Sequence, residues 1–323
     1  MVSENRLSVG PPLSTAITPI LTGPTACGKT AFALELAARW NLEIINADSL
    51  LVYRDFNIGT AKPTPEERQG IPHHLIDIRS PEETYTAAEF VRDVERLLLD
   101  LTLRSRRAII VGGTPFYLKA LCFGLWDAPP TQPAFRETLE GVSTQSLYEK
   151  LLAQDSEHAL KLGSQDRYRL IRALEILEFS GKKPSLLEQE AKQRSPDPRF
   201  PLWVMDRPAQ ELEQRISQRI DAMLASGLVD EVQALRERYS QARALKSVGY
   251  AQTLEYLDQT PPRGRVRRPG LDGLRDEIQL ATRQLVKSQR TFFRGLPHAQ
   301  WFLFEQERLK LEALAQPLFK ESS

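Results

Sequence analysis

The 323-residue chain carries 43 Lys and Arg against 42 Asp and Glu, so its net charge of +1 excludes binding of nucleic acid through overall charge, and any such surface must be local. Two cysteines exclude a disulfide framework and favour a cytoplasmic protein, and the lack of a long apolar run argues against contact with a membrane. The length fits two domains, or one with an insertion, after a flexible tail over residues 1–16.

The first motif, Gly-Pro-Thr-Ala-Cys-Gly-Lys-Thr, matches G-x-x-x-x-G-K-[ST] at each fixed position. A short strand that begins after Pro19 precedes it, and a helix from Thr30 to Trp40 follows, so the helix N-terminus would face a bound anion. In such a loop the backbone N–H groups surround a di- or triphosphate and the lysine neutralises its charge. The predicted phosphate-binding residues are Gly23, Pro24, Thr25, Ala26, Cys27, Gly28, Lys29 and Thr30.

A second apolar run begins at Leu42 and stops at Asp48, which predicts a buried parallel strand with a carboxylate at its carboxyl end. Ligands of open α/β sheets bind beyond that end of the strands, so we expect Asp48 near whatever Lys29 holds. Asp48 is therefore a candidate general base. The alternatives are a turn cap or a water-mediated ligand of Mg²⁺.

Residues 53–62 read as an irregular loop over the site, and residues 72–77 as a short strand. His73 and His74 would point to opposite faces of that strand, so packing and local hydrogen bonds are expected of them, not a shared metal. A helix capped by Thr86 leads to a strand over 108–111. That strand ends in a Gly-Gly turn and Thr114, which can bring a hydroxyl to the same sheet edge.

From Trp126 to Asp197 the sequence is polar and without strand signals, which predicts a helical insertion with one clear helix from Asp166 to Ser180. Residues 17–125 and 198–323 would then form the core. The predicted fold class is α/β, with a parallel sheet like that of P-loop NTPases, flanked by helices and interrupted by the helical subdomain at 126–197.

The end of the chain predicts a long amphipathic helix that stops at Gly295, after a strand over 202–205 and a helix from Pro208 to Gly227. One side of the long helix carries Leu274, Ile278, Ala281, Leu285 and Phe292, and another carries Arg283, Lys287, Arg290 and Arg294. With Arg263, Arg265, Arg267 and Arg268 upstream, this basic stripe resembles a footprint for phosphate groups. The alternative is a solvated face paired with the nearby acids Asp272, Asp276 and Glu277.

From these residues alone two classes of enzyme remain: a P-loop kinase of a small molecule, and a transferase whose loop holds a diphosphate leaving group. A kinase also needs an acid that holds Mg²⁺ and commonly an arginine-bearing lid. An alkyl transferase needs a diphosphate clamp, a pocket that excludes water and one base, which Asp48 fits at least as well. A non-enzymatic switch protein is disfavoured because its usual guanine-reading motifs are missing.

A series of motifs between residues 20 and 294 resembles the tRNA dimethylallyltransferase family. They are residues 23–30, Ala47-Asp48-Ser49, Val52-Tyr53, Ile58 to Pro63, Pro72 to Asp77, Val111 to Thr114, Arg169 to Glu175, Asp221 to Val232, Val248 to Tyr250 and Thr282 to Gln284. The resemblance implies transfer of a dimethylallyl group from dimethylallyl diphosphate, with Mg²⁺, to N6 of the adenosine immediately 3′ of the tRNA anticodon. An adenylate prenyltransferase of the same superfamily is the alternative, but the helical insertion and basic helix favour a folded RNA.

The same resemblance assigns roles to single residues. Asp48 matches the family's catalytic acid, and Thr114 the threonine beside the target adenine. We expect Thr30 of the phosphate-binding loop to be the Mg²⁺ ligand. The residues implied to contact the anticodon stem-loop are Asp48, Ser49, Leu50, Leu51, Thr114, Arg136, Tyr168, Arg169, Leu170, Ile171 and Arg172. The helical spacing of the basic stripe adds Arg283, Lys287, Arg290 and Arg294 to the expected tRNA contacts. Leu51 stands where the family usually has glutamine, which argues against a hydrogen bond from this position to the base. Cys27 in place of serine, Ser288 in place of a basic residue and Phe292 in place of tryptophan are milder departures. A monomer is expected.

Overall fold

The computed structural model describes residues 16–126, 128–262, 264 and 266–319, so most of the expected tail, Arg263 and Arg265 lie outside the described residues. The chain divides into two compact units. The larger is formed by the residues up to Leu118 and from Pro198 onward, and the smaller by Lys119–Asp197. The expected insertion, 126–197, falls within the smaller unit.

The larger unit is built on a six-stranded sheet in the order β3-β2-β4-β1-β5-β6, in which all paired strands are parallel. This confirms the α/β prediction. The strands are β1 Ile20–Thr22, β2 Leu42–Asn46, β3 His73–His74, β4 Arg107–Val111, β5 Leu202–Asp206 and β6 Ala299–Leu303. β1 lies between β4 and β5, with Ile20 opposite both Ile110 and Leu202, so the phosphate-binding loop leaves the middle of the sheet.

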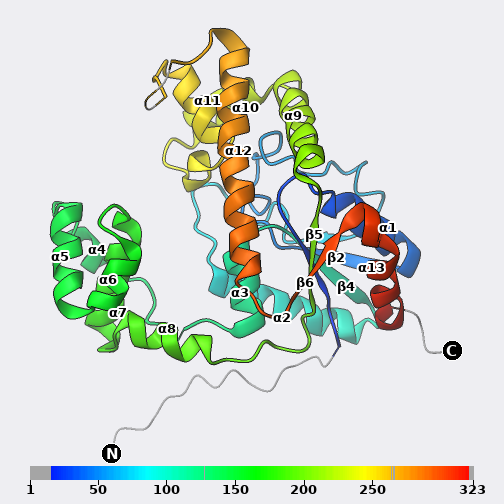
Figure 1. Ribbon diagram of the computed structural model, residues 1–323, viewed down its shortest axis with the longest axis horizontal. Coiled ribbons are helices and arrows are strands. Elements are labelled where there is room, and N and C mark those ends of the chain that lie inside the picture. Colours follow the sequence, from blue (N-terminus) through cyan, green and yellow to red (C-terminus); the bar gives the residue numbers. More distant parts are fainter. Residues whose placement is uncertain (1–15, 127, 263, 265, 320–323) are drawn as a thin grey trace, which may run out of the picture. The chain divides into compact units, whose positions relative to one another are not determined.

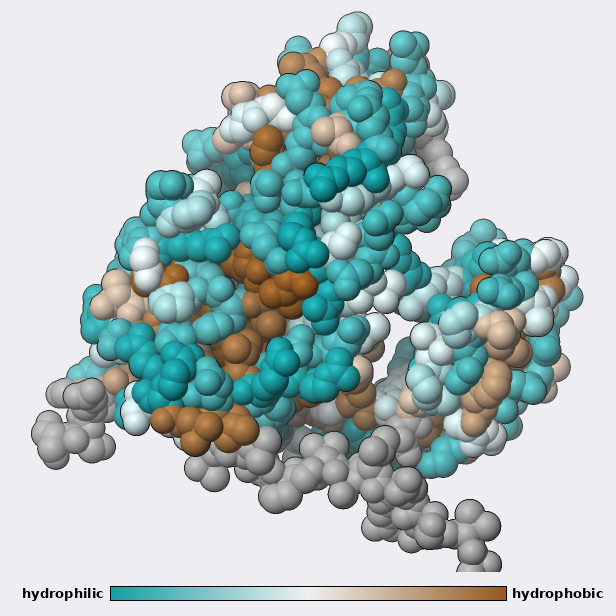
Figure 2. All heavy atoms as spheres, turned by 180° about the vertical axis from the view of Figure 1, so that it is seen from behind, coloured by the Kyte–Doolittle hydropathy of each residue, from teal (hydrophilic) through white to brown (hydrophobic). Residues whose placement is uncertain are grey.

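Helices cover the sheet and extend beyond it (Figure 1). Those of the larger unit are α1 Lys29–Trp40, α2 Ala87–Leu103, α9 Ala209–Ala225, α10 Leu228–Arg238, the 3₁₀-helix η1 Arg243–Lys246, α11 Tyr250–Leu257, α12 Gly270–Arg294 and α13 Phe304–Phe319, while α3 Pro115–Phe123 leads into the smaller unit. The predicted cap of α2 is a capping box between Thr86 and Glu89. On the face seen in Figure 2 most residues are hydrophilic, with separate hydrophobic patches between them.

The buried side of α12 corrects the expected apolar stripe in its second half. Leu274 and Ile278 are buried as expected, but Ala281, Leu285 and Phe292 are only partly buried. Their places in the interior are taken by Val286, Gln289 and Phe293. The expected stripe counted apolar residues only and therefore omitted Gln289. This polar side chain is buried because it hydrogen-bonds the backbone of Thr25 and Gly113.

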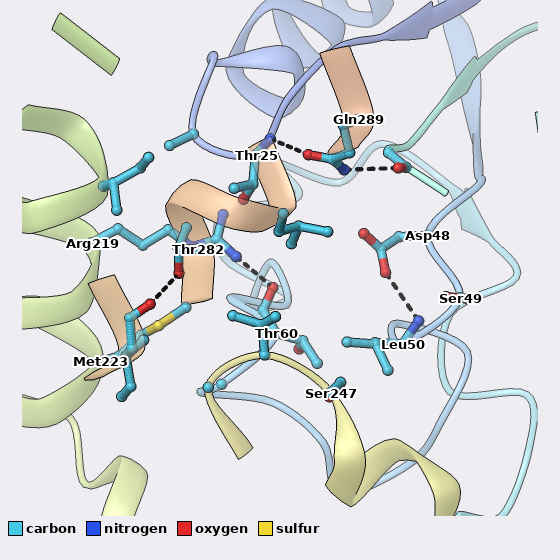
Figure 3. Close-up of a pocket in the computed structure, with 18 of the residues that line it drawn as sticks. Thr25, Asp48, Ser49, Leu50, Thr60, Arg219, Met223, Ser247, Thr282 and Gln289 are labelled. Atoms are coloured by element: carbon cyan, nitrogen blue, oxygen red, sulfur yellow. Dashed lines mark hydrogen bonds between the residues drawn. The ribbon is translucent and has the colours of Figure 1, made fainter. Parts of the chain in front are cut away.

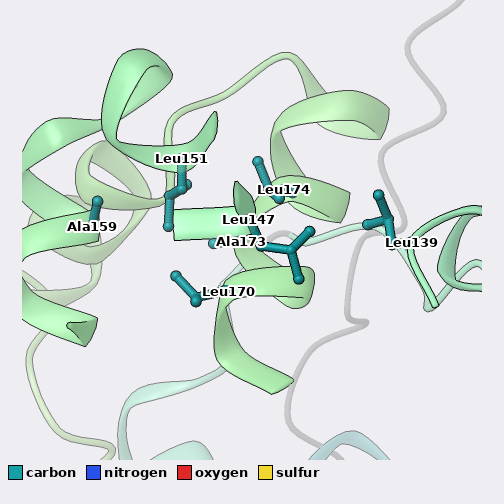
Figure 4. Close-up of a cluster of buried hydrophobic side chains, with 7 residues drawn as sticks. All are labelled: Leu139, Leu147, Leu151, Ala159, Leu170, Ala173 and Leu174. Atoms are coloured by element: carbon teal, nitrogen blue, oxygen red, sulfur yellow. The ribbon is translucent and has the colours of Figure 1, made fainter. Parts of the chain in front are cut away.

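The smaller unit contains only helices among its described residues: α4 Pro133–Thr138, α5 Thr144–Gln154, α6 Ser156–Leu162, α7 Arg167–Ser180 and α8 Pro184–Lys192. Its core is a cluster of buried side chains, drawn in Figure 4: Leu139, Leu147, Leu151, Ala159, Leu170, Ala173 and Leu174. Leu170 is fully buried, so its side chain has no exposed surface for tRNA, and the expected contact stays a prediction. The first turn of α7 points this residue inward, and Ile171 packs partly buried beside it.

Candidate active site

The phosphate-binding loop connects the end of β1 to the first turn of α1. Gly23 has φ +142°, and a Cβ there would lie 2.0 Å from the carbonyl oxygen of Met205, so only glycine fits. Lys29 donates from Nζ to the carbonyl oxygens of Gly23 at 3.0 Å and Pro24 at 2.9 Å. Cys27 is fully buried, and its side chain therefore faces the protein interior. Backbone N–H groups and a lysine at a helix N-terminus form an anion-binding site.

Asp48 follows β2 at the same sheet edge. Its Oδ1 accepts a hydrogen bond from the backbone N–H of Leu50 at 2.9 Å, so the carboxylate does cap a turn. The side chain of Asn46 fixes the backbone of Asp48 by accepting from its N–H at 2.9 Å and donating to its carbonyl oxygen at 3.0 Å. Oδ2 has no hydrogen-bond partner among the described residues, and it remains available on the side of the pocket (Figure 3).

Thr114 joins the ends of β4 and β2. Its Oγ1 accepts from the backbone N–H of Ser49 at 2.8 Å and lies 3.2 Å from the Ser49 hydroxyl, to which it donates. Gly112 permits this approach, because a Cβ there would come within 2.2 Å of the backbone of Ala47. The Gly-Gly-Thr turn is thus a close contact between two strand ends, and it places the threonine hydroxyl near Asp48.

A pocket of about 410 Å³ opens between these strand ends and the helices α9 and α12 (Figure 3). Its walls are Thr25, Ala26, Asp48, Ser49, Leu50, Gly59, Thr60, Gly113, Thr114, Pro115, Ile216, Arg219, Ile220, Met223, Lys246, Ser247, Val248, Gly249, Ile278, Thr282, Leu285 and Gln289. The pocket therefore brings the phosphate-binding loop together with Asp48 and Thr114. Leu51, expected to contact tRNA, is not among the walls.

Arg219 is a charged wall of this pocket to which sequence reasoning assigned no role. It lies on α9 and donates from Nη2 to the carbonyl oxygen of Thr60 at 3.0 Å. Burial lowers the pKa of its guanidinium, and the charge of Asp48 opposes that shift. The available signal was the four-residue spacing of Arg215 and Arg219 on a face of α9 other than its apolar stripe.

Two further arginines flank the phosphate-binding loop. Arg207 donates from Nε to the Cys27 carbonyl oxygen at 2.7 Å, and Glu211 and Glu305 balance its charge. Arg215 donates from Nε to the Ala26 carbonyl oxygen at 2.8 Å and makes no ion pair within the described chain. Arg207 is thus a structural support, and Arg215 a cation beside the loop.

Gln289 on α12 connects the two glycine turns of the site. Its Oε1 accepts from the backbone N–H of Thr25 at 3.0 Å, and its Nε2 donates to the carbonyl oxygen of Gly113 at 2.8 Å (Figure 3). The side chain is buried, so both bonds are protected from water. Sequence analysis missed Gln289. Its signal was weak: a single glutamine at a helix position in register with the buried residues.

The basic stripe of α12 lines a second cavity of about 370 Å³ beside α9. Arg283 pairs with Glu213, and Arg290 bonds Asp206 from Nε, at 3.0 and 3.2 Å, and from Nη2, at 2.7 Å. The stripe is thus partly paired with acids, but these belong to α9 and β5. Of the expected local acids, Asp276 pairs with Arg268, outside the four residues of the stripe.

The other two members of the stripe differ from these. Arg294 lies over the ring of Trp301, 5.6 Å from its centroid. Lys287 is exposed and makes no ion pair with any residue that the structure describes. Lys287 is therefore the member best suited to bind an external phosphate.

In the smaller unit, Arg136 and Arg172 bind the same buried carboxylate. Arg136 donates to Glu175 from Nε at 3.0 Å and from Nη2 at 2.9 Å, and Arg172 pairs with it as well. Burial raises the pKa of Glu175, but these hydrogen bonds outweigh it and lower the pKa to about 2. Tyr168 is 49% exposed next to Arg136, and Arg169 is exposed with Asp166 as partner. Arg136 and Arg172 thus have a structural partner, Glu175, that sequence reasoning did not predict.

His73 and His74 make the local hydrogen bonds expected of them. His73 donates from Nδ1 to the carbonyl oxygen of Ile71 at 2.8 Å, and His74 Nε2 lies 2.7 Å from Glu43. Among the described residues no group of three His, Cys, Asp or Glu side chains is placed to hold a metal ion. The part of the chain that the structure covers also has no helix long and apolar enough to cross a membrane.

A phosphate-binding loop in the middle of a parallel sheet, with a carboxylate and an arginine across one pocket, defines a P-loop-type transferase. A family model described as IPP transferase matches residues 51–296, and the chain belongs to this family. A tRNA dimethylallyltransferase of Polaromonas sp. is 41% identical over 94% of this chain and 96% of its own, and one of Azoarcus sp. is 42% identical over 93% and 92%. The resemblance inferred from the sequence motifs is confirmed.

Solved structures agree with this assignment. A tRNA isopentenylpyrophosphate transferase from Staphylococcus epidermidis is similar with a TM-score of 0.66 and 28% identity, over 95% of this chain and 100% of that one. A eukaryotic dimethylallyltransferase acting on tRNA is similar with a TM-score of 0.77 and 26% identity, over 94% of this chain and 78% of the other.

Proposed function

We propose that this protein transfers a dimethylallyl group from dimethylallyl diphosphate to N6 of the adenosine immediately 3′ of the anticodon in tRNA. The observation that carries the proposal is the single pocket shared by the phosphate-binding loop and the Asp48 carboxylate. Relatives about 41% identical over nearly the whole chain are named tRNA dimethylallyltransferases, which supports the same reaction.

The donor is proposed to bind with its diphosphate on the loop. The backbone N–H groups of residues 26–30 and the cations Lys29, Arg215 and Arg219 would balance its charge. The apolar walls Ile216, Ile220 and Met223 offer the prenyl group a site from which water is excluded. In the reaction a C–N bond forms at the allylic carbon, the C–O bond to diphosphate breaks, and diphosphate leaves.

The acceptor adenine is proposed to reach the pocket by leaving its stack in the anticodon loop. Asp48 would then take a proton from N6 through Oδ2, because the cap to Leu50 uses Oδ1. The Thr114 hydroxyl, fixed by Ser49, would orient the base. The carboxylate and the cations that face the leaving group therefore act on opposite sides of the new bond.

Mg²⁺ is proposed as cofactor, with the exposed Thr30 hydroxyl at the start of α1 as its protein ligand. Few protein oxygens at the site suit this ion, because Mg²⁺ keeps several waters and binds largely through substrate phosphates. When bound, it would add positive charge to the departing diphosphate.

Contact with the anticodon stem-loop is proposed for the rims of both units. On α12, Lys287 and Arg294 are exposed, whereas Arg283 and Arg290 would have to share or exchange their acids. On α7, Tyr168 and Arg169 are exposed. A cytoplasmic monomer belongs to the same proposal, since both cysteines are free and buried and two compact units supply all residues named here.

The test is to incubate the protein with unmodified tRNA and labelled dimethylallyl diphosphate in the absence of nucleotide, and to identify the nucleosides after digestion. We expect N6-(dimethylallyl)adenosine at the position 3′ of the anticodon and one diphosphate per product. Prenylation of free adenosine phosphates, with tRNA unmodified, would instead assign an adenylate prenyltransferase. A strict need for ATP, with ADP formed in step with product, would assign a kinase.

A further inference from the structure

The carboxylate of Glu231, in the first turn of α10, is occupied by three amides of a loop that lines the pocket and by the hydroxyl of a tyrosine on α11. Its Oε2 accepts from the backbone N–H groups of Asn57 at 3.0 Å and Ile58 at 2.7 Å. Its Oε1 accepts from the N–H of Gly59 at 3.0 Å and from the Tyr250 hydroxyl at 2.7 Å. One carboxylate thus holds three consecutive backbone amides of the loop. These hydrogen bonds are charge-assisted and therefore stronger than bonds to a neutral acceptor.

The held loop leads directly to Arg219 in the wall of the pocket. Gly59 and Thr60 are both walls, and the carbonyl oxygen of Thr60 accepts the bond from Arg219 at 3.0 Å (Figure 3). Only the Gly59–Thr60 peptide separates the amides bound by Glu231 from the carbonyl that binds Arg219. A shift of the loop would therefore move the guanidinium.

Tyr250 supports the same loop from behind. Its side chain is fully buried, and its ring lies 4.8 Å from that of Phe56. A Cβ on Gly59 would come within 2.5 Å of the Tyr250 ring, so glycine is required for this contact. Burial raises the pKa of the Tyr250 hydroxyl, which therefore stays protonated and donates to Glu231. The loop is thus fixed in two directions, by hydrogen bonds and by an aromatic surface.

We propose that Glu231 is a positioning residue for prenyl transfer: it fixes the Gly59–Thr60 loop and, through the Thr60 carbonyl, aims Arg219 at the diphosphate leaving group. This inference rests on the proposed function only for the identity of that leaving group. Glu231 is not itself a wall of the pocket, so its effect on catalysis passes through the Gly59–Thr60 loop to Arg219. A displacement of about 1 Å at a catalytic group can cost about 100-fold in rate.

The variant E231Q tests the proposal with little change of shape. A glutamine keeps one acceptor oxygen for two of the amides. Its NH₂ group would face the N–H of Gly59, and two donors cannot bond each other, so the position of the loop at Gly59 is no longer fixed. We expect the single-turnover rate at saturating tRNA and donor to fall by about 10- to 100-fold. The matched control is E237Q on the exposed face of the same helix, which should leave the rate unchanged. Among the described residues, Glu237 bonds Gln233 alone.

A double-variant cycle separates positioning from general destabilisation. Arg219→Met removes the guanidinium but keeps the length of the side chain, so Glu231 then has no cation to aim. We expect the rate of the double variant to equal that of Arg219→Met within about two-fold, because the two changes act on one element. Independent, multiplied losses, or an E231Q rate equal to that of E237Q, would overturn the proposal.

A milder variant covers the case in which E231Q does not fold. Y250F removes one of the four bonds to the carboxylate and leaves the three amides in place. We expect a loss of about 2- to 10-fold, again absent when Arg219 is already Met; a loss that multiplies would overturn the proposal. If the unchanged protein gives no prenylated tRNA, the proposed function fails. In that case binding of inorganic diphosphate, weakened by E231Q and not by E237Q, still decides the positioning role.

Discussion

The Asp48 carboxylate accepts the backbone N–H of Leu50 with one oxygen, at 2.9 Å, and keeps the other for the pocket. The turn cap and the general base are therefore compatible roles of one side chain. The cap also sets the direction of the free oxygen, because the bond to Leu50 fixes the rotation of the carboxylate.

Asp48→Asn should separate the two roles. An asparagine can still accept the Leu50 N–H with Oδ1, so the turn survives, but it cannot take the proton from N6. We expect the single-turnover rate constant to fall by about 10²–10⁴-fold, roughly 3–5 kcal/mol in the barrier, with affinity for the donor nearly unchanged. Measured by rapid quench at saturating substrates, a near-normal rate combined with weak donor binding or poor folding would assign Asp48 to a structural or metal-holding role.

The members of the basic stripe should respond differently to removal. Lys287 is exposed and unpaired among the described residues, so Lys287→Ala should weaken tRNA binding and reduce the slope of log affinity against log salt by about one unit or less. Arg290 is partly buried on Asp206, and Arg290→Ala should lower the free energy of unfolding by roughly 1–3 kcal/mol, since the acid is left without its partner. Salt titrations and denaturant unfolding measure the two effects. Equal changes of tRNA affinity and of unfolding free energy in the two variants would contradict this distinction between a binding Lys287 and a structural Arg290.

Sequence alone predicted those parts of the fold that depend on local patterns. The apolar runs of β2 and β4, the capping box at Thr86 and the loop before α1 are signals contained in a few residues. β6 gave no such signal, because it is an edge strand whose residues are largely half-exposed. Asp48 and Thr114 were predictable since carboxyl ends of parallel strands share one edge of the sheet.

The remaining site residues come from distant helices. Gln289 bonds Thr25 across 264 positions, and Arg219 bonds Thr60 across 159. Periodicity indicates the face of a helix on which such a residue lies, but the partner on that face depends on how the elements pack. The ion pairs of Arg136 and Arg172 with Glu175 were hidden for the same reason.

Glu175 should make stability depend on pH in the acid range. Its pKa is about 2 in the folded protein against an ordinary value of 4.5, so the unfolded chain binds a proton first as pH falls. The contribution is complete above about pH 5 and is lost between about pH 5 and 2, up to about 3 kcal/mol. Urea unfolding of the protein and of Glu175→Gln over this range measures it. The difference between the two should shrink as pH falls, and a constant difference would contradict the assigned shift.

Leu170 and Arg169, neighbours on α7, should differ in role: the first should stabilise the fold and the second should bind tRNA. Its side chain is fully buried in the core of the smaller unit, so Leu170→Ala should lower the free energy of unfolding by about 2–5 kcal/mol. The neighbour Arg169 is exposed, and Arg169→Ala should change stability by no more than about 0.5 kcal/mol. Under conditions where both variants are folded, tRNA affinity should fall for Arg169→Ala and not for Leu170→Ala. Calorimetry and filter binding compare them, and weaker tRNA binding by a folded Leu170→Ala variant would return Leu170 to the interface.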